Sequence, residues 1–277
     1  MAKHREVSAA DAARYRADGY LFPVDALDAA EVAAARDWLA DFECRHAGVP
    51  ARERRELLRF KPHLLHPELD RIVRHPRILD AVEAVIGPDI MVWASAFFIK
   101  DARDAAFVSW HQDSITYGVE GGELVSAWIA ITDVDPGNAS MKFIPGSHHD
   151  GLVTHRFIAN PDNLVSLGET IEGVDEGRAV SVALKAGQMS LHALDLMHAS
   201  DANASDRRRI GYVVRYFEPS MRVREGAASA LLARGVDRHG HFELERPPAA
   251  ADDPATIAAH ARAMDLRRAR VLAKAAG

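Results

Sequence analysis

The sequence predicts a mostly β protein with flanking helices, in which a double-sheet antiparallel jelly roll lies between helical segments at the two ends of the chain. Residues 1–88 show the apolar spacing of amphipathic helices, and from residue 90 onward the period becomes two. The β-rich runs that follow are separated by short Gly, Pro, Asn and Asp turns, with no long helix between them. Without helical crossovers, neighbouring strands pair antiparallel, which favours a jelly roll.

Three helical segments precede the strands. The first, SAADAARYRAD, has Ser8 as a candidate N-cap. The second, DAAEVAAARDWLADFECRH, carries apolar residues at helical spacing from Val32 to Phe42. The third, PELDRIVRHPRILDAVEAVIG, is interrupted at Pro76 and ends at Gly87.

The predicted strands lie between residues 90 and 219. They are IMVWASAFFIK, LVSAWIAITDV, SMKFIPG, AVSVALKAG, QMSLHALD and RRRIGYVVRYFEP. Between them, residues 150–178 are rich in Asn, Gly and acidic side chains and are long for a connection, which makes this segment a candidate lid.

We expect no further strand after residue 219. The terminal run DDPATIAAHARAMDLRRARVLAKAAG predicts a helix that packs on the outside of the core or against a second subunit, so a homodimer is one arrangement that the chain allows. The sequence contains no repeat and no low-complexity linker. It therefore predicts a single domain over residues 1–277, with a helical layer at 1–88, a jelly-roll core at 89–219 and a helical extension at 220–277.

Composition excludes several classes of partner. The net charge of −6 and the pI near 6.2 argue against nucleic acid, and the basic cluster at residues 207–209 is too short to change that. The single cysteine, Cys44, cannot form an internal disulfide. The first residues lack an apolar signal region, and no stretch reaches the ~18 apolar residues that span a bilayer. We therefore expect a cytoplasmic protein with a small-molecule substrate.

The stretch SWHQDSITYGVEGG places His111 and Asp113 two positions apart in a run that indicates a strand, so both side chains would leave the same face. Taken alone, an H-x-D is more often a polar pair at the end of a strand. Two later histidines, His192 and His198, lie in or beside another strand-like segment. One of them would complete the two-histidine, one-carboxylate set that binds non-haem Fe(II) and leaves open positions.

Further motifs follow in a fixed order along the chain. They are W-H-Q-D at 110–113, S-A-W-I-A-I-T-D at 126–133, M-K-F-I-P-G-S-H at 141–148, H-A-S at 198–200, N-A-S-D-R-R-R at 203–209 and R-Y at 215–216. In order and spacing they resemble the phytanoyl-CoA dioxygenase family of Fe(II)/2-oxoglutarate-dependent oxygenases, over roughly Tyr15 to Arg222. The resemblance implies a double-stranded β-helix, the cupin-like jelly roll, with Fe(II) as cofactor and 2-oxoglutarate and O₂ as cosubstrates.

The resemblance also implies roles for individual residues. His111, Asp113 and His198 match the iron ligands at the catalytic centre, while His192 matches a neighbouring position that does not bind metal. Arg209 matches the arginine that binds the far carboxylate of 2-oxoglutarate, a task suited to the two parallel donors of a guanidinium.

Two further residues match the cosubstrate site. Ser200 would assist the same carboxylate, and Trp128 would form a wall of the pocket, for which plain core packing is an equal alternative. The carboxylate at Asp113 bears on the reaction type as well. Halogenating relatives carry a small residue at that position, so the resemblance favours hydroxylation.

Three classes of function remain open. The first is a dioxygenase that hydroxylates an unactivated C–H bond and releases succinate and CO₂. The second is a jelly-roll zinc hydrolase, because two histidines and a carboxylate also fit Zn²⁺. The third is a non-catalytic, cupin-like metal-binding module. Arg209 favours the first, because neither hydrolysis nor simple binding requires an arginine at that place.

The substrate is expected to be a small polar or anionic metabolite, because the sequence shows no basic run near the site for an acyl-CoA. If the strand from Arg209 to Arg215 is regular, both side chains point into the barrel. A buried guanidinium without an anion is costly. Arg215 is therefore expected to meet either an internal carboxylate or an anionic group of the cosubstrate or substrate.

Overall fold

The computed structural model describes residues 6–165, 168–251 and 253–276, and it contains the predicted N-terminal helices. The hydroxyl of Ser8 accepts a hydrogen bond from the backbone N–H of Asp11, which confirms the predicted N-cap. The helices are α1 (Ala9–Asp18), α2 (Ala29–Arg45), α3 (Ala51–Leu57), the 3₁₀ turn η1 (Pro62–Leu64), α4 (Pro67–Val73) and α5 (Pro76–Ile86). Pro76 separates the last two, and Gly87, with φ of 92°, ends α5.

One strand interrupts this layer, so the prediction of helices alone over residues 1–88 is wrong. β1 (Tyr20–Asp25) pairs antiparallel with β10 (Gln188–Ala193), and Tyr20 lies opposite His192. The run YLFPVD is rich in aromatic and β-branched residues, and Leu21 and Val24 are buried. Its partner lies far along the chain, which is why the local pattern did not reveal it.

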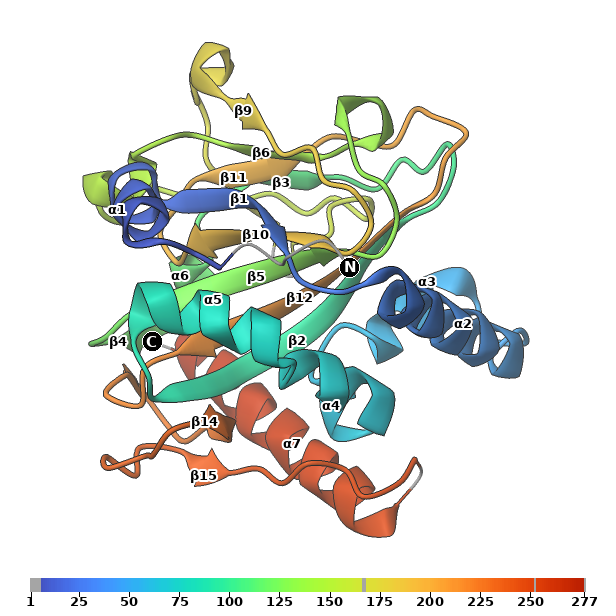
Figure 1. Cartoon of the computed structure of the whole chain (residues 1–277), viewed down its shortest axis with the longest axis vertical. Coiled ribbons are helices and arrows are strands. Elements are labelled where there is room, and N and C mark those ends of the chain that lie inside the picture. The colour runs from blue at the N-terminus through green and yellow to red at the C-terminus, as the bar shows by residue number, and fades with distance from the viewer. Residues whose placement is uncertain (1–5, 166–167, 252, 277) are drawn as a thin grey trace.

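Two sheets face each other and form the core (Figure 1). The large sheet has the strand order β1-β10-β5-β12-β2-β14-β15, and the smaller one has the order β3-β11-β6-β9. Besides β1 and β10, their strands include β2 (Ile90–Lys100), β3 (Val108–His111), β5 (Leu124–Ala130), β6 (Met141–Phe143), β9 (Val180–Ser181), β11 (His198–Ser200) and β12 (Arg209–Phe217). From β2 to β6 and from β9 to β12 the chain passes back and forth between the two antiparallel sheets, which confirms the predicted jelly roll.

Short elements join these strands. They are α6 (Ser114–Tyr117), β4 (Val119–Glu120) and the 3₁₀ turns η2 (Pro136–Asn138), η3 (Ser147–Asp150) and η4 (Glu176–Arg178). No helix among the described residues is long and apolar enough to cross a membrane.

The C-terminal part contains strands that the sequence did not predict. β14 (Ser229–Arg234) pairs antiparallel with β2, β15 (Glu243–Leu244) pairs parallel with β14, and β13 (Arg222–Val223) pairs with β4. The run SALLAR has no β-branched residue, so its extended form depends on pairing with β2 and on burial of Leu231.

The predicted terminal helix is present as α7 (Pro254–Ala276), beside β14 and β15 in Figure 1. On α7, His260 Nε2 donates a hydrogen bond to the Phe60 carbonyl at 2.9 Å. α7 is therefore fixed to the segment between α3 and η1.

β12 decides which side chains enter the barrel. It pairs with β2 in unbroken register from Arg209, opposite Lys100, to Arg215, opposite Ala94. The predicted alternation is thus confirmed, and four residues share one face: Arg209, Gly211, Val213 and Arg215. The opposite face packs under α4 and α5, where the Tyr216 hydroxyl donates to the Val73 carbonyl. The four residues therefore face the space between the two sheets.

The long connection over residues 150–178 covers β3. It contains the two-stranded ribbon of β7 (Arg156–Phe157) and β8 (Glu169–Thr170). The backbone N–H of Ile171 donates to the Trp110 carbonyl at 2.7 Å, and the Gln112 side-chain amide donates to the Gly151 carbonyl at 2.8 Å. These bonds hold the connection against the strand that carries His111.

Candidate functional site

Three side chains from the smaller sheet and its adjoining turn converge between the sheets. His111 ends β3 and lies directly opposite His198, the first residue of β11. Asp113 follows β3 at the start of α6. One ligand atom from each of the three lies within 4.8 Å of the others, and all three residues are buried. His111 and Asp113 were expected to share a strand face, but the strand ends at His111 and the turn into α6 brings Asp113 back toward it.

Backbone carbonyls fix the tautomers of both histidines. His111 Nδ1 donates to the Ser109 carbonyl at 2.9 Å, and His198 Nδ1 donates to the Leu196 carbonyl at 2.9 Å. Each Nε2 therefore keeps its lone pair free for a metal. Burial, with a further contribution from His111, holds the pKa of His198 well below its ordinary value, which also keeps the ring neutral.

Asp113 is held in its ionised form. Burial, the largest single influence, would raise the pKa of its carboxyl, but Arg215, His111 and His198 together outweigh burial and lower the pKa well below the ordinary range. Arg215 Nε lies 3.8 Å from Asp113 Oδ2, and the Ser126 hydroxyl donates to the same oxygen at 3.2 Å. The site therefore offers the Nε2 atoms of two histidines and one carboxylate.

His192 lies beside this set and is not part of it. Its ring centroid is 4.9 Å from that of His198 and 5.2 Å from that of Phe143. Burial lowers the pKa of His192 to about 4, so the ring is neutral at pH 7. The three atoms that converge belong to the other residues.

Arg209 is a buried cation without an anion. The residue is 1% exposed, and its Nε and Nη1 have no hydrogen-bond partner among the described residues. Its guanidinium carbon lies 4.7 Å from the centroid of the Trp128 ring, and burial lowers the pKa of Arg209 to about 9. Such a group is costly unless an anion pairs with it. Arg209 and the three-residue cluster therefore fit a ligand that carries a carboxylate at one end and binds a metal at the other.

Lys100, which the sequence analysis missed, lies next to this arginine. It is fully buried opposite Arg209 and donates to the Ser200 hydroxyl at 2.7 Å. Burial, with the charge of Arg209, lowers the pKa of Lys100 to about 6. The sequence held a signal for Lys100, because this lysine ends the apolar run IMVWASAFFIK. Its pairing with Arg209 places it on the inner face of the strand. Ser200 thus lies at the Arg209 end, where the sequence placed it.

Trp128 lies on the inner face of β5 and packs against Gly211. A Cβ atom built on Gly211 would lie 1.8 Å from Trp128 Cζ2. The absence of a side chain at Gly211 therefore allows the indole to lie beside Arg209. This requirement was not visible in the sequence, because it depends on the pairing of β5 with β12.

We expect Gly211→Ala to lower both stability and affinity for the carboxylate ligand. The indole must move or the strands must separate, and overpacking of this kind costs roughly 1–3 kcal/mol. The melting temperature should fall by several degrees in differential scanning fluorimetry. Gly48→Ala is the matched control, since a Cβ there meets nothing within 4 Å. Equal melting temperatures and ligand affinities for Gly211→Ala and wild type would contradict this account of Trp128.

Arg215 points inward as predicted and meets an internal carboxylate, Asp113. Its guanidinium carbon lies 5.3 Å from the centroid of the Tyr117 ring, on α6. Tyr117, the second residue that the sequence analysis missed, is half-buried beside Asp113 and Arg215, and burial of its hydroxyl raises the pKa of that group well above the ordinary value. Arg215 therefore belongs to the metal end of the site.

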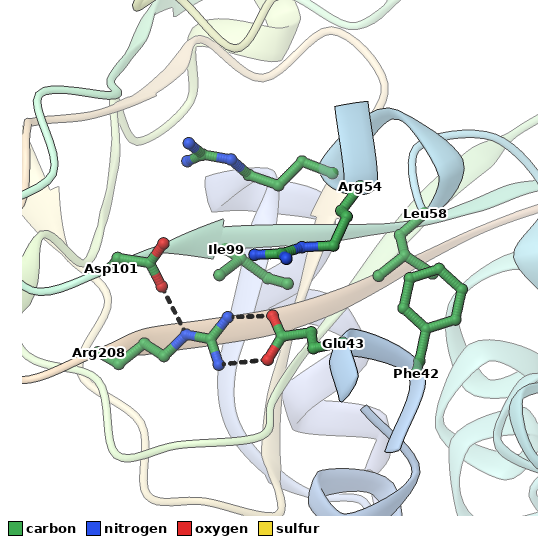
Figure 2. Close-up of a pocket in the computed structure, with 8 residues that line it drawn as sticks. Phe42, Glu43, Arg54, Leu58, Ile99, Asp101 and Arg208 are labelled. Carbon is green, nitrogen blue, oxygen red and sulfur yellow. Dashed lines mark hydrogen bonds and ion pairs between the residues drawn. The ribbon is translucent and has the colours of Figure 1, made fainter. Parts of the chain in front are cut away.

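A separate pocket of about 280 Å³ lies on the other side of β2 and β12 (Figure 2). It is lined by Ile99, Asp101 and Arg208, whose chain neighbours Lys100 and Arg209 face the barrel. Figure 2 shows Arg208 paired with both Glu43 and Asp101. These two ion pairs already satisfy the charge of Arg208. Because the pocket lies on the outer face of these strands, it is distinct from the metal-binding cluster.

Comparison with known proteins gives consistent matches. The family described as "Phytanoyl-CoA dioxygenase (PhyH)" matches residues 15–211. A probable alpha-ketoglutarate-dependent hypophosphite dioxygenase of Stutzerimonas stutzeri is 26% identical over 184 residues, which are 66% of this chain and 61% of that protein. An ectoine dioxygenase of Bordetella parapertussis is 28% identical over 224 residues, 72% of this chain and 71% of that protein. The match thus spans somewhat less than two thirds of the first relative's length.

A solved structure resembles the whole chain more closely. The apo form of ThoJ, described as a non-heme monooxygenase, superposes with a TM-score of 0.84 at 36% sequence identity. The superposition covers 94% of this chain and 96% of that protein. The likeness therefore extends over nearly the whole chain.

Proposed function

Since this chain belongs to the phytanoyl-CoA dioxygenase family of Fe(II)/2-oxoglutarate-dependent oxygenases, we propose that it hydroxylates an unactivated C–H bond of a small polar or anionic metabolite. Its cofactor is Fe(II), and its cosubstrates are 2-oxoglutarate and O₂. We further propose that residues 1–277 act as one oxygenase domain. The observation that carries the proposal is the buried guanidinium of Arg209, which meets no anion among the described residues and faces the same space between the two sheets as the metal-binding cluster.

In this proposal, the metal is held by the Nε2 atoms of His111 and His198 and by the carboxylate of Asp113. Burial favours the neutral ring of His198, and the charges around Asp113 favour its ionised carboxylate, the forms that metal binding requires. Ser126 and Arg215 orient the carboxylate from behind. When bound, Fe(II) and 2-oxoglutarate supply the oxidising chemistry, in which succinate and CO₂ form and one oxygen atom passes to the substrate.

The far carboxylate of 2-oxoglutarate would pair with Arg209. Nε and Nη1 have no partner among the described residues, so the guanidinium has donors free for a carboxylate. Lys100 and Ser200 lie beside this arginine as further polar groups. Trp128 forms an apolar wall against Arg209, which lowers the local dielectric and strengthens the pairing.

Hydroxylation of a small substrate agrees with the relatives. One relative is named for hypophosphite, a small anion, another for ectoine, and the structural neighbour is described as a monooxygenase. Asp113 supplies the third protein ligand, which a halogenase of this family would lack.

The test is the release of succinate from 2-oxoglutarate with consumption of O₂. Protein reconstituted anaerobically with Fe(II) is expected to form both succinate and CO₂ once O₂ is admitted, and product mass should show the gain of one oxygen atom in a productive substrate. Zn²⁺-loaded protein is the control and should form no succinate. Hydrolysis by the zinc form without any succinate from the iron form would favour the zinc hydrolase, and a product of unchanged mass would refute hydroxylation.

A further inference from the structure

A group of arginines borders the metal end of the site, and two of them come from outside the barrel. Arg215 belongs to β12 and contacts Asp113 and Tyr117. Arg59 follows α3, and Arg267 lies on α7. The three come from three different parts of the chain, so their proximity is a product of the fold.

Arg59 reaches the inner face of the large sheet. Its guanidinium carbon lies 4.3 Å from the centroid of the Phe98 ring. Phe98 is opposite Gly211 in the pairing of β2 with β12 and therefore shares the face that carries Arg209 and Arg215. Arg59 also donates to the Leu164 carbonyl in the connection that covers β3. Arg59 thus lies between the sheet and this covering segment.

Arg267 approaches the same region from α7. The guanidinium carbon of Arg267 lies 4.9 Å from the centroid of the Phe60 ring. Phe60 directly follows Arg59 in the sequence. The bond from His260 to the Phe60 carbonyl fixes α7 at this place. Phe60 and Tyr117 both pack against the buried cluster around Trp93, whose ring centroid is 6.1 Å from that of Tyr117. Aromatic rings therefore lie between and beside the cations.

The electrostatic effects agree with this placement. Burial lowers the pKa of Arg59 to about 10 and also lowers the pKa of Arg267. Glu56 raises both values, whereas Arg215 lowers both, so both guanidinium groups lie within electrostatic reach of the arginine at the metal site.

The cluster carries an uncompensated positive charge. Among the described residues, no carboxylate lies within ion-pair distance of Arg59 or Arg267, and Glu56 acts on them only through its charge. Within this cluster, the three arginines outnumber the two carboxylates of Asp113 and Glu56 that act on them. Water would solvate this excess charge if the arginines were fully exposed. Arg59 and Arg267 are instead partly buried against aromatic rings, where an unpaired charge is costly.

We infer that Arg59 and Arg267 form the receptor for an anionic group on the primary substrate, a carboxylate or a phosphonate, with Phe60, Phe98 and Tyr117 contacting its apolar part. The inference rests on the proposed function, because it places the substrate at the metal end of the same barrel. It gives the terminal helix a place in substrate binding. It also assigns Arg215 to the support of Asp113.

Binding of simple aromatic anions tests this inference. Protein loaded anaerobically with Fe(II) and saturating 2-oxoglutarate is titrated in a calorimeter with phenylphosphonate, phenylacetate and the neutral phenylacetamide at equal ionic strength. At least one anion should bind about tenfold or more tightly than the amide. Arg267→Met should weaken anion binding by about tenfold or more, the effect of losing one charge-assisted hydrogen bond. Arg59→Met should do the same.

Arg268→Met is the matched control, because Arg268 is an exposed neighbour on α7 that pairs with Asp265. It should bind the anions as the wild type does. Arg59 also donates a hydrogen bond to the Leu164 carbonyl, so Arg59→Met could weaken binding by disturbing the covering segment. Arg267→Met is therefore the deciding variant, and circular dichroism checks its fold.

Two failures are distinguishable. If Fe(II) and 2-oxoglutarate bind and succinate forms, yet neither anion binds more tightly than the amide, or Arg267→Met binds both as the wild type does, the arginine receptor is refuted and the dioxygenase proposal stands. If the protein forms no succinate at all, the proposed function fails, whatever the calorimetry shows.

Discussion

Replacement of His111, Asp113 or His198 by alanine is expected to abolish 2-oxoglutarate turnover and stoichiometric Fe(II) binding. Each of these residues supplies one of the three atoms that converge within 4.8 Å, and no other described histidine, cysteine or acidic side chain joins them. Loss of an orienting partner behind a ligand typically costs 10–100-fold, so loss of the ligand itself should exceed about 100-fold. Anaerobic Fe(II) titration and succinate release measure the two effects.

His192→Ala is the matched control for this series, since His192 is buried beside His198 but lies outside the converging set. It should keep one Fe(II) per chain. If His192→Ala loses the metal while His198→Ala retains it, the assignment of the third ligand is wrong.

Arg209→Lys is expected to raise the Michaelis constant for 2-oxoglutarate by about tenfold or more while Fe(II) affinity changes little. Lysine keeps the charge but loses the planar fork that presents two parallel donors to one carboxylate. The energetic loss is that of a charge-assisted hydrogen bond inside a buried site, about 1.5–3 kcal/mol. Initial rates of succinate formation over a range of 2-oxoglutarate concentrations give the constant.

Arg207→Lys is the control for this substitution. Arg207 lies two residues earlier, is exposed and pairs with Asp135 on the surface, so its replacement should leave the constant unchanged. An unchanged constant in Arg209→Lys would instead assign the carboxylate to another basic residue, of which Lys100 is the nearest candidate.

Much of the site could be predicted because its signals are short and local. The H-x-D motif, the later histidine and the arginine after it follow the order of a known family, so a resemblance carried over residue by residue names them. Strand alternation then placed Arg215 on the inner face with Arg209, and the register of β12 with β2 confirms it. These inferences needed only the chain order and the period of a strand.

Other features depend on contacts between distant segments. β1 and β14 were missed because a short strand is stabilised by its partner, and SALLAR has little preference for extended structure. Lys100, Tyr117 and Gly211 acquire their surroundings only when β2, β5 and β12 lie side by side.

The sequence by itself determined the order of the main helices and of the central strands, the chemical type of the metal ligands and the inward direction of Arg209 and Arg215, since these follow from motif order and strand periodicity. Only the tertiary structure decided that Arg59 and Arg267 approach the metal end, because they lie on elements outside the barrel. The pairing of a charged side chain depends on which groups packing brings within a few ångströms of it. For these two arginines, that packing joins α3, β2 and α7, which are far apart in the sequence.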